Sequence, residues 1–118
     1  PILKAKKIQK KASKKGFDWK ETIDVIKKVE EELTELKHEI QQNNKKKSQE
    51  ELGDLLFSII NLSRHLKVDA SEAINQANHK FVKRFSLMEE EISKNAKEMD
   101  NLTSEELEEF WVKIKLHE

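Results

Sequence analysis

The scarcity of helix-breaking residues is the feature that most constrains how this chain can fold. Its 118 residues include only two glycines, Gly16 and Gly53, and one proline, Pro1. Glycine and proline interrupt helices most strongly, whereas lysine, glutamate and leucine, which are abundant here, favour them. No stretch shows the alternation of polar and apolar residues that is typical of strands. The sequence therefore predicts an all-α protein whose helices are joined by short polar turns.

Helix boundaries follow from apolar periodicity and from capping residues. Apolar side chains recur three and four residues apart, as they do on the buried face of a helix. Helices are expected over about residues 2–14, 18–41, 49–67, 70–95 and from 104 onwards, with the most loop-like stretch at 41–49. Three pairs have capping-box spacing: Asp18 with Glu21, Asp69 with Glu72, and Thr103 with Glu106. These elements fit an antiparallel helical bundle of four main helices with short flanking helices.

The helix expected at 49–67 has two contrasting faces. Its apolar face consists of Leu52, Leu55, Leu56, Ile59, Leu62 and Leu66, and the opposite polar stripe consists of Asp54, Ser58, Asn61 and His65. We expect the apolar face to pack in the core, because burial of apolar surface is the main drive to fold. Gly53 within this helix indicates close packing or a ligand that needs room. Phe57 and Ile60 lie off the apolar face and indicate an additional interface or a pocket.

Charge and composition exclude several classes of function. Lysine plus arginine and aspartate plus glutamate both number 23, so the net charge is zero, which argues against non-specific nucleic-acid binding. The absence of cysteine excludes disulfides, thiolate metal sites and a cysteine nucleophile, and it is compatible with the cytoplasmic location that we predict. No apolar run has membrane-spanning length and no signal-peptide pattern opens the chain, so no membrane partner is expected.

The length fits one domain, residues 1–118, with no room for a second. The first residue is Pro1 rather than methionine, as expected of a processed protein or of a piece of a longer one. Apolar residues make up only 36% of the chain, which predicts a thin core. Because thin helical bundles gain stability by self-association, we expect a homodimer or a higher homo-oligomer.

Two groups of acidic residues form the most informative constellation. The first group is Glu31, Glu32 and Glu35, and the second is Glu51 with Asp54. Residues three apart lie one helical turn apart on a shared face. If the two helices pack antiparallel, the carboxylates of Glu32, Glu35, Glu51 and Asp54 converge at the edge of the core. An all-oxygen site of this kind suits a hard divalent cation and leaves positions open for water and phosphate.

Each acidic group also has an ordinary structural interpretation. Acidic residues on a helix usually form a solvated face, and Glu51 lies at capping-box spacing from Ser48. Glu35 with His38 matches half of the motif found in di-iron helical bundles. That site needs two copies of the motif and this chain has one, which disfavours di-iron chemistry.

Five segments resemble, in the same order, the MazG family of nucleotide pyrophosphohydrolases. They are Gly16-Phe17-Asp18-Trp19, Glu31-Glu32-x-x-Glu35, Glu50-Glu51-Leu52-Gly53-Asp54-Leu55-Leu56-Phe57, Asn61-Leu62-Ser63-Arg64-His65-Leu66 and Asn78-His79-Lys80-Phe81. The resemblance covers nearly the whole chain and is closest to the C-terminal of the two domains that bacterial MazG proteins often carry. It implies an α-helical dimer that uses Mg²⁺, with Mn²⁺ as a substitute, to hydrolyse nucleoside triphosphates to monophosphate and pyrophosphate.

The resemblance also implies roles for individual residues. The metal would be held by Glu32, Glu35, Glu51 and Asp54, which Glu31 joins in the catalytic set. The nucleotide-binding set would be Lys28, Lys47, Asn61, Lys80, Arg84 and Trp111, with the four cations facing the phosphates and Trp111 near the base. Taken without the resemblance, Trp111 is more typical of a core or interface residue.

Two other functions stay open at this point. One is a related all-α pyrophosphohydrolase with a narrower substrate, either dUTP and dCTP or phosphoribosyl-ATP. The other is a non-catalytic helical interaction module. Residues 16–19 and the region around Trp111 favour MazG over the narrower enzymes, and the intact set of four carboxylates counts against the module.

Overall fold

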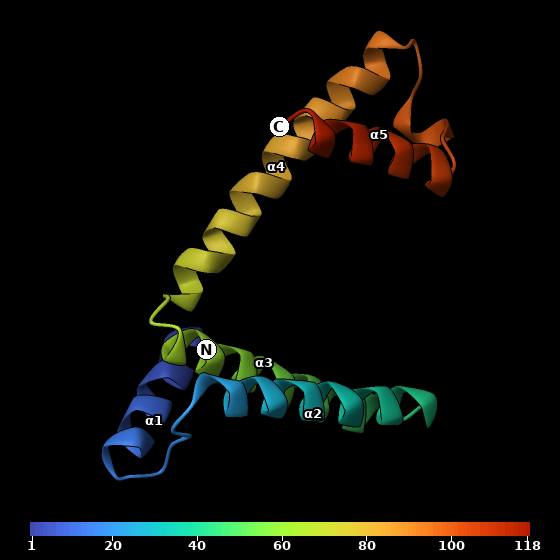
Figure 1. The fold of residues 1–118 in the computed structure, drawn as a ribbon. Helices are drawn as coiled ribbons and strands as arrows, with labels where there is room; N and C mark the ends of the chain where they lie inside the picture. Colours follow the sequence, from blue (N-terminus) through green and yellow to red (C-terminus); the bar gives the residue numbers. More distant parts are fainter. The chain divides into compact units, whose positions relative to one another are not determined.

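The computed structural model describes all 118 residues and contains only helices and the turns between them (Figure 1). The elements in chain order are α1 (Ile2–Lys14), α2 (Thr22–Gln41), α3 (Lys45–His65), α4 (Ala70–Lys94), the 3-10 helix η1 (Met99–Asn101) and α5 (Ser104–Leu116). The all-α expectation is therefore confirmed. None of the helices is both long and apolar enough to cross a membrane.

The chain divides into two units, which are described separately. The first unit is Pro1–Ala73 and the second is Ile74–Glu118. In the first unit α2 lies alongside α3, and α1 also contacts α3 (Figure 1). In the second unit α4 is followed by η1 and by α5.

The turn between α2 and α3 is shorter than the sequence predicts. The expected loop at 41–49 is in fact confined to the few residues before Lys45, and α3 begins about four residues earlier than expected. Asn44 provides the cap, because its side-chain oxygen accepts a hydrogen bond from the backbone N–H of Lys47 at 3.0 Å. The lysines that follow are good helix formers and extend the helix backwards. The alternative in which Ser48 caps α3 is therefore wrong.

The three predicted capping pairs have different outcomes. Thr103 and Glu106 form a reciprocal capping box at the start of α5, as expected. Asp69 accepts a hydrogen bond from the N–H of Ser71 at 2.9 Å, next to the start of α4. The third pair, at the start of α2, is wrong, because Glu21 occupies the N-cap position without a side-chain cap bond.

Asp18 instead joins the turn after α1 to the C-terminal part of α3. Its Oδ1 atom lies 2.7 Å from Nη2 of Arg64 and 2.9 Å from Nε2 of His65, while Oδ2 accepts a hydrogen bond from Ser13 at 2.9 Å. Asn61 completes the cluster by accepting two bonds from the Arg64 guanidinium, at 3.2 and 2.9 Å. The hydrogen bond from Arg64 holds the pKa of the Asp18 carboxyl well below its ordinary value, although burial opposes this.

This cluster reverses the expected burial of α3. Ser58 and Asn61, from the polar stripe, are each only 6% exposed, whereas Leu56 and Leu66 are 53% and 54% exposed. The inward polar side chains are hydrogen-bonded: the Ser58 hydroxyl donates within α3 to the carbonyl of Leu55, and Asn61 accepts from Arg64. Within the first unit the apolar face of α3 is therefore largely exposed, contrary to the expectation that it packs in a core.

The second unit is held together by side chains from α4 and α5. Phe81 stacks on Phe85 with ring centroids 5.9 Å apart, and Trp111 of α5 packs on Phe81 at 5.3 Å. Met88 and Ile92 are the buried residues of α4. These contacts give the unit a small apolar core, whose burial is the main contribution to its stability.

Asp18→Asn tests the cluster as a structural tie. The substitution removes the charge that holds Arg64, so we expect a loss of about 1–3 kcal/mol in unfolding free energy at neutral pH. A depressed acid pKa stabilises the fold fully above the ordinary value of 3.8, and this stabilisation is lost as the pH falls towards the folded pKa. The difference between wild type and variant should therefore shrink below about pH 4. Denaturant titrations at several pH values measure it, with Glu50→Gln, an exposed acid on α3, as the control. Equal stability of the two variants at neutral pH would contradict the tie.

Candidate functional site

The α2–α3 hairpin brings together acidic residues that are far apart in the sequence. Glu32 and Glu35 lie on α2, and Glu51 lies in the second turn of α3. One carboxylate oxygen from each of these three residues lies within 4.8 Å of the other two. Asp54 is exposed and stands one turn beyond Glu51, outside this group of three. The structure thus gathers three of the four expected metal ligands, which we call the acidic cluster.

The acidic cluster is partly shielded from water. Glu32 is only 6% exposed, and its Oε1 atom lies 2.9 Å from Nζ of Lys28. Its other oxygen, Oε2, is buried without a hydrogen-bond partner, and the same holds for Oε2 of Glu51. A buried carboxylate oxygen without a hydrogen-bond partner lowers the stability of the fold. A ligand bound to both oxygens would remove this penalty.

Charge and burial change the acid–base properties of the cluster. Burial raises the pKa of Glu51 above its ordinary value, and the neighbouring carboxylates of Glu35, Asp54 and Glu32 raise it further. The pKa of Lys28 is raised as well, which for a cation favours the charged form. The hydrogen bond to Glu32 raises the pKa of the Lys28 ammonium, which therefore stays charged beside the cluster.

The donor set fits a divalent metal ion. The ligand atoms are all carboxylate oxygens, two of them are buried without a partner, and the chain has no cysteine to offer a soft ligand. Hard cations such as Mg²⁺ and Mn²⁺ prefer this chemistry. A bound cation would also offset the repulsion among the three carboxylates.

The other residues expected in the first unit differ in their surroundings. Glu31 is exposed and lies 3.5 Å from Lys28 Nζ. Lys47 is exposed in the first turn of α3. Asn61 is buried in the Asp18 cluster, where its side-chain oxygen is already bonded to Arg64. Gly53 faces open space, so the close packing that the sequence suggested there is absent.

The expected nucleotide ligands of the second unit lie on α4 and α5. Lys80 is exposed, one turn before Arg84. The guanidinium of Arg84 binds both carboxylate oxygens of Glu118, through Nε at 2.5 Å and Nη2 at 2.7 Å. Trp111 is half-buried against Phe81, which matches its interpretation as a core residue. Its expected contact with a base stays a prediction.

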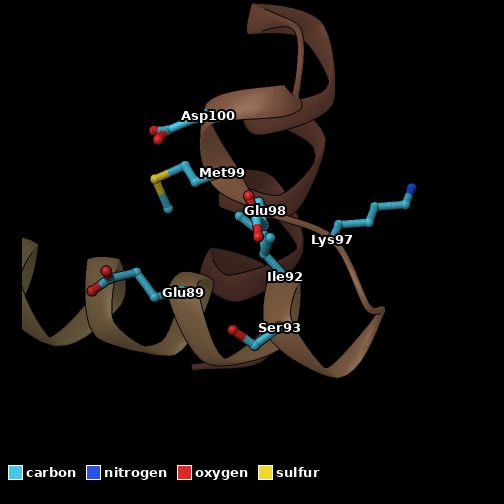
Figure 2. A pocket seen from close by; sticks show the side chains of 7 residues that line it. All are labelled: Glu89, Ile92, Ser93, Lys97, Glu98, Met99 and Asp100. Atoms are coloured by element: carbon cyan, nitrogen blue, oxygen red, sulfur yellow. The ribbon is translucent and has the colours of Figure 1, made fainter.

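A separate hollow of the second unit contains none of these residues. It has a volume of about 320 Å³ and lies between the end of α4 and η1, with Glu89, Glu98 and Asp100 among its lining side chains (Figure 2). Glu98 and Asp100 come from the segment after α4, and Glu89 from α4 itself. No cation side chain other than Lys97 lines it, so it offers little to a phosphate.

A comparison with protein families identifies the family of this chain. A family model described as the MazG nucleotide pyrophosphohydrolase domain matches residues 20–86, which is more than half of the chain. The chain belongs to the MazG family. The matched residues contain both acidic groups and extend past Arg84, so the resemblance stated from the five segments is confirmed.

Curated relatives of this MazG chain are longer proteins. It is 49% identical over 111 residues to the nucleoside triphosphate pyrophosphohydrolase/pyrophosphatase MazG of Thermotoga maritima, covering 94% of this chain and 42% of that protein. It is 40% identical over 119 residues to the nucleoside triphosphate pyrophosphohydrolase of Escherichia coli K12, covering 99% of this chain and 45% of the relative. The chain thus spans less than half the length of these relatives.

The sequence does not predict the contact of Asp18 with Arg64 and His65. Asp18, Arg64 and His65 were all part of the recognised segments, yet we had expected Asp18 to cap a helix. Their convergence depends on the turn after α1 reaching α3, a contact between residues 46 and 47 positions apart. The oppositely charged side chains in two recognised segments were the signal that could have indicated the pair.

Glu51→Gln tests whether repulsion in the acidic cluster opposes folding. A raised acid pKa means that the charged form costs stability, fully above the folded pKa and not at all below the ordinary value of 4.5. We therefore expect the metal-free variant to melt at a higher temperature than wild type at neutral pH, with the gain disappearing below about pH 4.5.

Thermal melts in excess EDTA at several pH values measure this gain. Glu30→Gln is the control, because Glu30 is exposed on the same helix as Glu32 but lies two residues, or about 200° of helical rotation, away from it. A gain of the same size in the control would mean that general charge reduction, not the acidic cluster, is responsible.

Proposed function

We propose that this chain hydrolyses nucleoside triphosphates between the α- and β-phosphates, giving nucleoside monophosphate and pyrophosphate. The observation that carries the proposal is the acidic cluster, in which oxygens of Glu32, Glu35 and Glu51 lie within 4.8 Å of one another. The proposed cofactor is Mg²⁺, with Mn²⁺ as a substitute, held by these three residues and by Asp54. The relatives named nucleoside triphosphate pyrophosphohydrolases support this choice of substrate.

The chemistry that we propose divides between the metal and the protein. A bound Mg²⁺ supplies a water of lowered pKa and offsets the charge of the departing pyrophosphate. Lys28, which keeps its charge beside Glu32, adds a cation on the same edge of α2. Glu31 is exposed and stands outside the acidic cluster, and we propose it as the carboxylate that accepts the proton from water.

The proposed contacts with the nucleotide rest on the family resemblance. We propose that three cations on the helices bind the phosphates of the nucleotide: Lys47 of α3, and Lys80 and Arg84 of α4. Asn61 is also proposed as a nucleotide ligand, and its oxygen accepts a hydrogen bond from Arg64. Trp111 is proposed to stack on the base, an interaction that is worth about 1–3 kcal/mol and tolerates any base.

Asp54→Asn separates a catalytic carboxylate from a surface one. We expect the variant to lose most pyrophosphate release, on the order of a hundredfold or more, because Asn keeps the shape but cannot offer a charged oxygen to Mg²⁺. Mg²⁺ should also raise the melting temperature of wild type more than that of the variant.

A panel of nucleoside triphosphates with pyrophosphate detection, in Mg²⁺ and in excess EDTA, measures the turnover. Glu30→Gln is again the control and should keep wild-type turnover. Full turnover in EDTA, or equal turnover of Asp54→Asn and wild type, would overturn the proposed function. A substrate range restricted to dUTP and dCTP would favour the narrower alternative.

We also propose that the chain acts as a homodimer or a higher homo-oligomer. The apolar face of α3 is largely exposed within the first unit, and apolar residues of α2 and of α4 are exposed within their own units. The exposed set includes Leu33, Ile40, Leu52, Leu56, Phe57, Ile59, Ile74, Phe81 and Val82. Exposed apolar surface of this extent is typical of a protein interface, and a second copy offers the same surface in return.

Light scattering tests the assembly. At micromolar concentration we expect a mass of at least twice 13.9 kDa. Leu56→Glu places a charge on the apolar face of α3 and should shift the protein towards the monomer. Glu50→Gln changes the charge by one unit at an exposed position of α3, about 120° of helical rotation from Leu56, and should leave the mass unchanged. A monomeric wild type contradicts the proposal.

A further inference from the structure

The ion pair between Arg84 and Glu118 has the geometry of an anion-binding site that is already filled. Both carboxylate oxygens of Glu118 accept hydrogen bonds from the guanidinium, at 2.5 and 2.7 Å. Arginine binds carboxylate and phosphate with the same two-pronged arrangement of parallel N–H bonds. A carboxylate in this position therefore occupies the donors that a phosphate oxygen pair would use.

The surroundings of Glu118 are rich in cations. Glu118 lines a hollow of about 770 Å³ whose lining also includes two lysines, Lys80 and Lys83, and one further acid, Glu91. The bond from Arg84 lowers the pKa of the Glu118 carboxyl, and the charges of Lys83 and Lys80 lower it further. Glu118 thus stands as an anion among several cations, as a bound phosphate would.

The contact is open enough to exchange. The side chain of Arg84 is 18% exposed and that of Glu118 is 33% exposed, so water and solutes reach both partners. Ion pairs that solvent reaches contribute little to stability, because water and salt screen them. A polyphosphate carries more charge than one carboxylate and gains from Lys80 and Lys83 as well as from Arg84.

From this geometry we propose that Glu118 acts as a built-in competitor that occupies Arg84 until a substrate phosphate displaces it. The proposal rests on the proposed function, since it assumes that Arg84 binds a phosphate of the nucleotide. The apparent affinity for the nucleotide is then reduced in proportion to the fraction of molecules in which Arg84 is free. Glu118 also keeps the Arg84 guanidinium paired and oriented when no nucleotide is bound.

Glu118→Gln is the principal test. Glutamine cannot form the charged pair, so Arg84 is freed. The dissociation constant of a non-hydrolysable analogue, α,β-methylene ATP with Mg²⁺, should fall about two- to sixfold, and KM should fall with it while kcat is unchanged. The double variant Arg84→Ala/Glu118→Gln should lose this gain, because the gain requires the freed guanidinium.

Glu91→Gln is the matched control. Glu91 lines the same hollow and forms the other ion pair between α4 and α5, to Lys113 at 3.0 Å. Removing its charge changes the local potential equally but does not free Arg84, so the affinity should stay within twofold of wild type. An equal gain in both variants would mean that local charge alone sets the affinity, and would overturn the proposal.

Binding of inorganic tripolyphosphate separates this proposal from the proposed function. If Glu118→Gln binds tripolyphosphate more tightly but neither protein hydrolyses any nucleotide, the exchange at Arg84 stands and the proposed function fails. If wild type hydrolyses nucleotides and Glu118→Gln binds the analogue no more tightly than wild type, the proposed function stands and the exchange is wrong.

Discussion

The packing of α2 against α3 holds like charges closer together than a solvated surface would. Oxygens of Glu32, Glu35 and Glu51 lie within 4.8 Å of one another, and two buried oxygens of the cluster lack a partner. Only Lys28 offsets this charge directly, through its pair with Glu32. Repulsion among these carboxylates destabilises the hairpin when no cation is bound. Binding of a cation would remove the repulsion and stabilise the folded state.

The Asp18 cluster explains why the hairpin exposes so much apolar surface. Asp18 binds Arg64 and His65, and on the same helix Ser58 and Asn61 face inwards while Leu52, Leu56 and Leu66 are exposed. Ordinary folding of a lone helical bundle would reverse this arrangement. An inward polar stripe is stable here because its groups are hydrogen-bonded, and the outward apolar face is then available to a further layer of protein.

The second unit contains two kinds of contact, aromatic packing and ion pairs. Phe81 and Trp111 supply the apolar packing between α4 and α5, while the Arg84–Glu118 and Lys113–Glu91 pairs lie at the surface. Trp111 thereby has a structural role whether or not it also meets a base. The surface pairs contribute little to stability, which leaves Arg84 free to exchange its partner at low cost.

The sequence by itself determined the helical class, the approximate helix bounds and the residues of the two acidic groups, because periodicity, capping and helical spacing are local properties. It identified the MazG family through ordered segments, and three of the four residues expected to bind the metal lie close together. Only the tertiary structure decided which face of α3 is buried, that Asp18 binds Arg64 rather than capping α2, and that Glu118 occupies Arg84. Those outcomes depend on side chains 34 to 47 positions apart, whereas periodicity and capping patterns describe only neighbours within one helix.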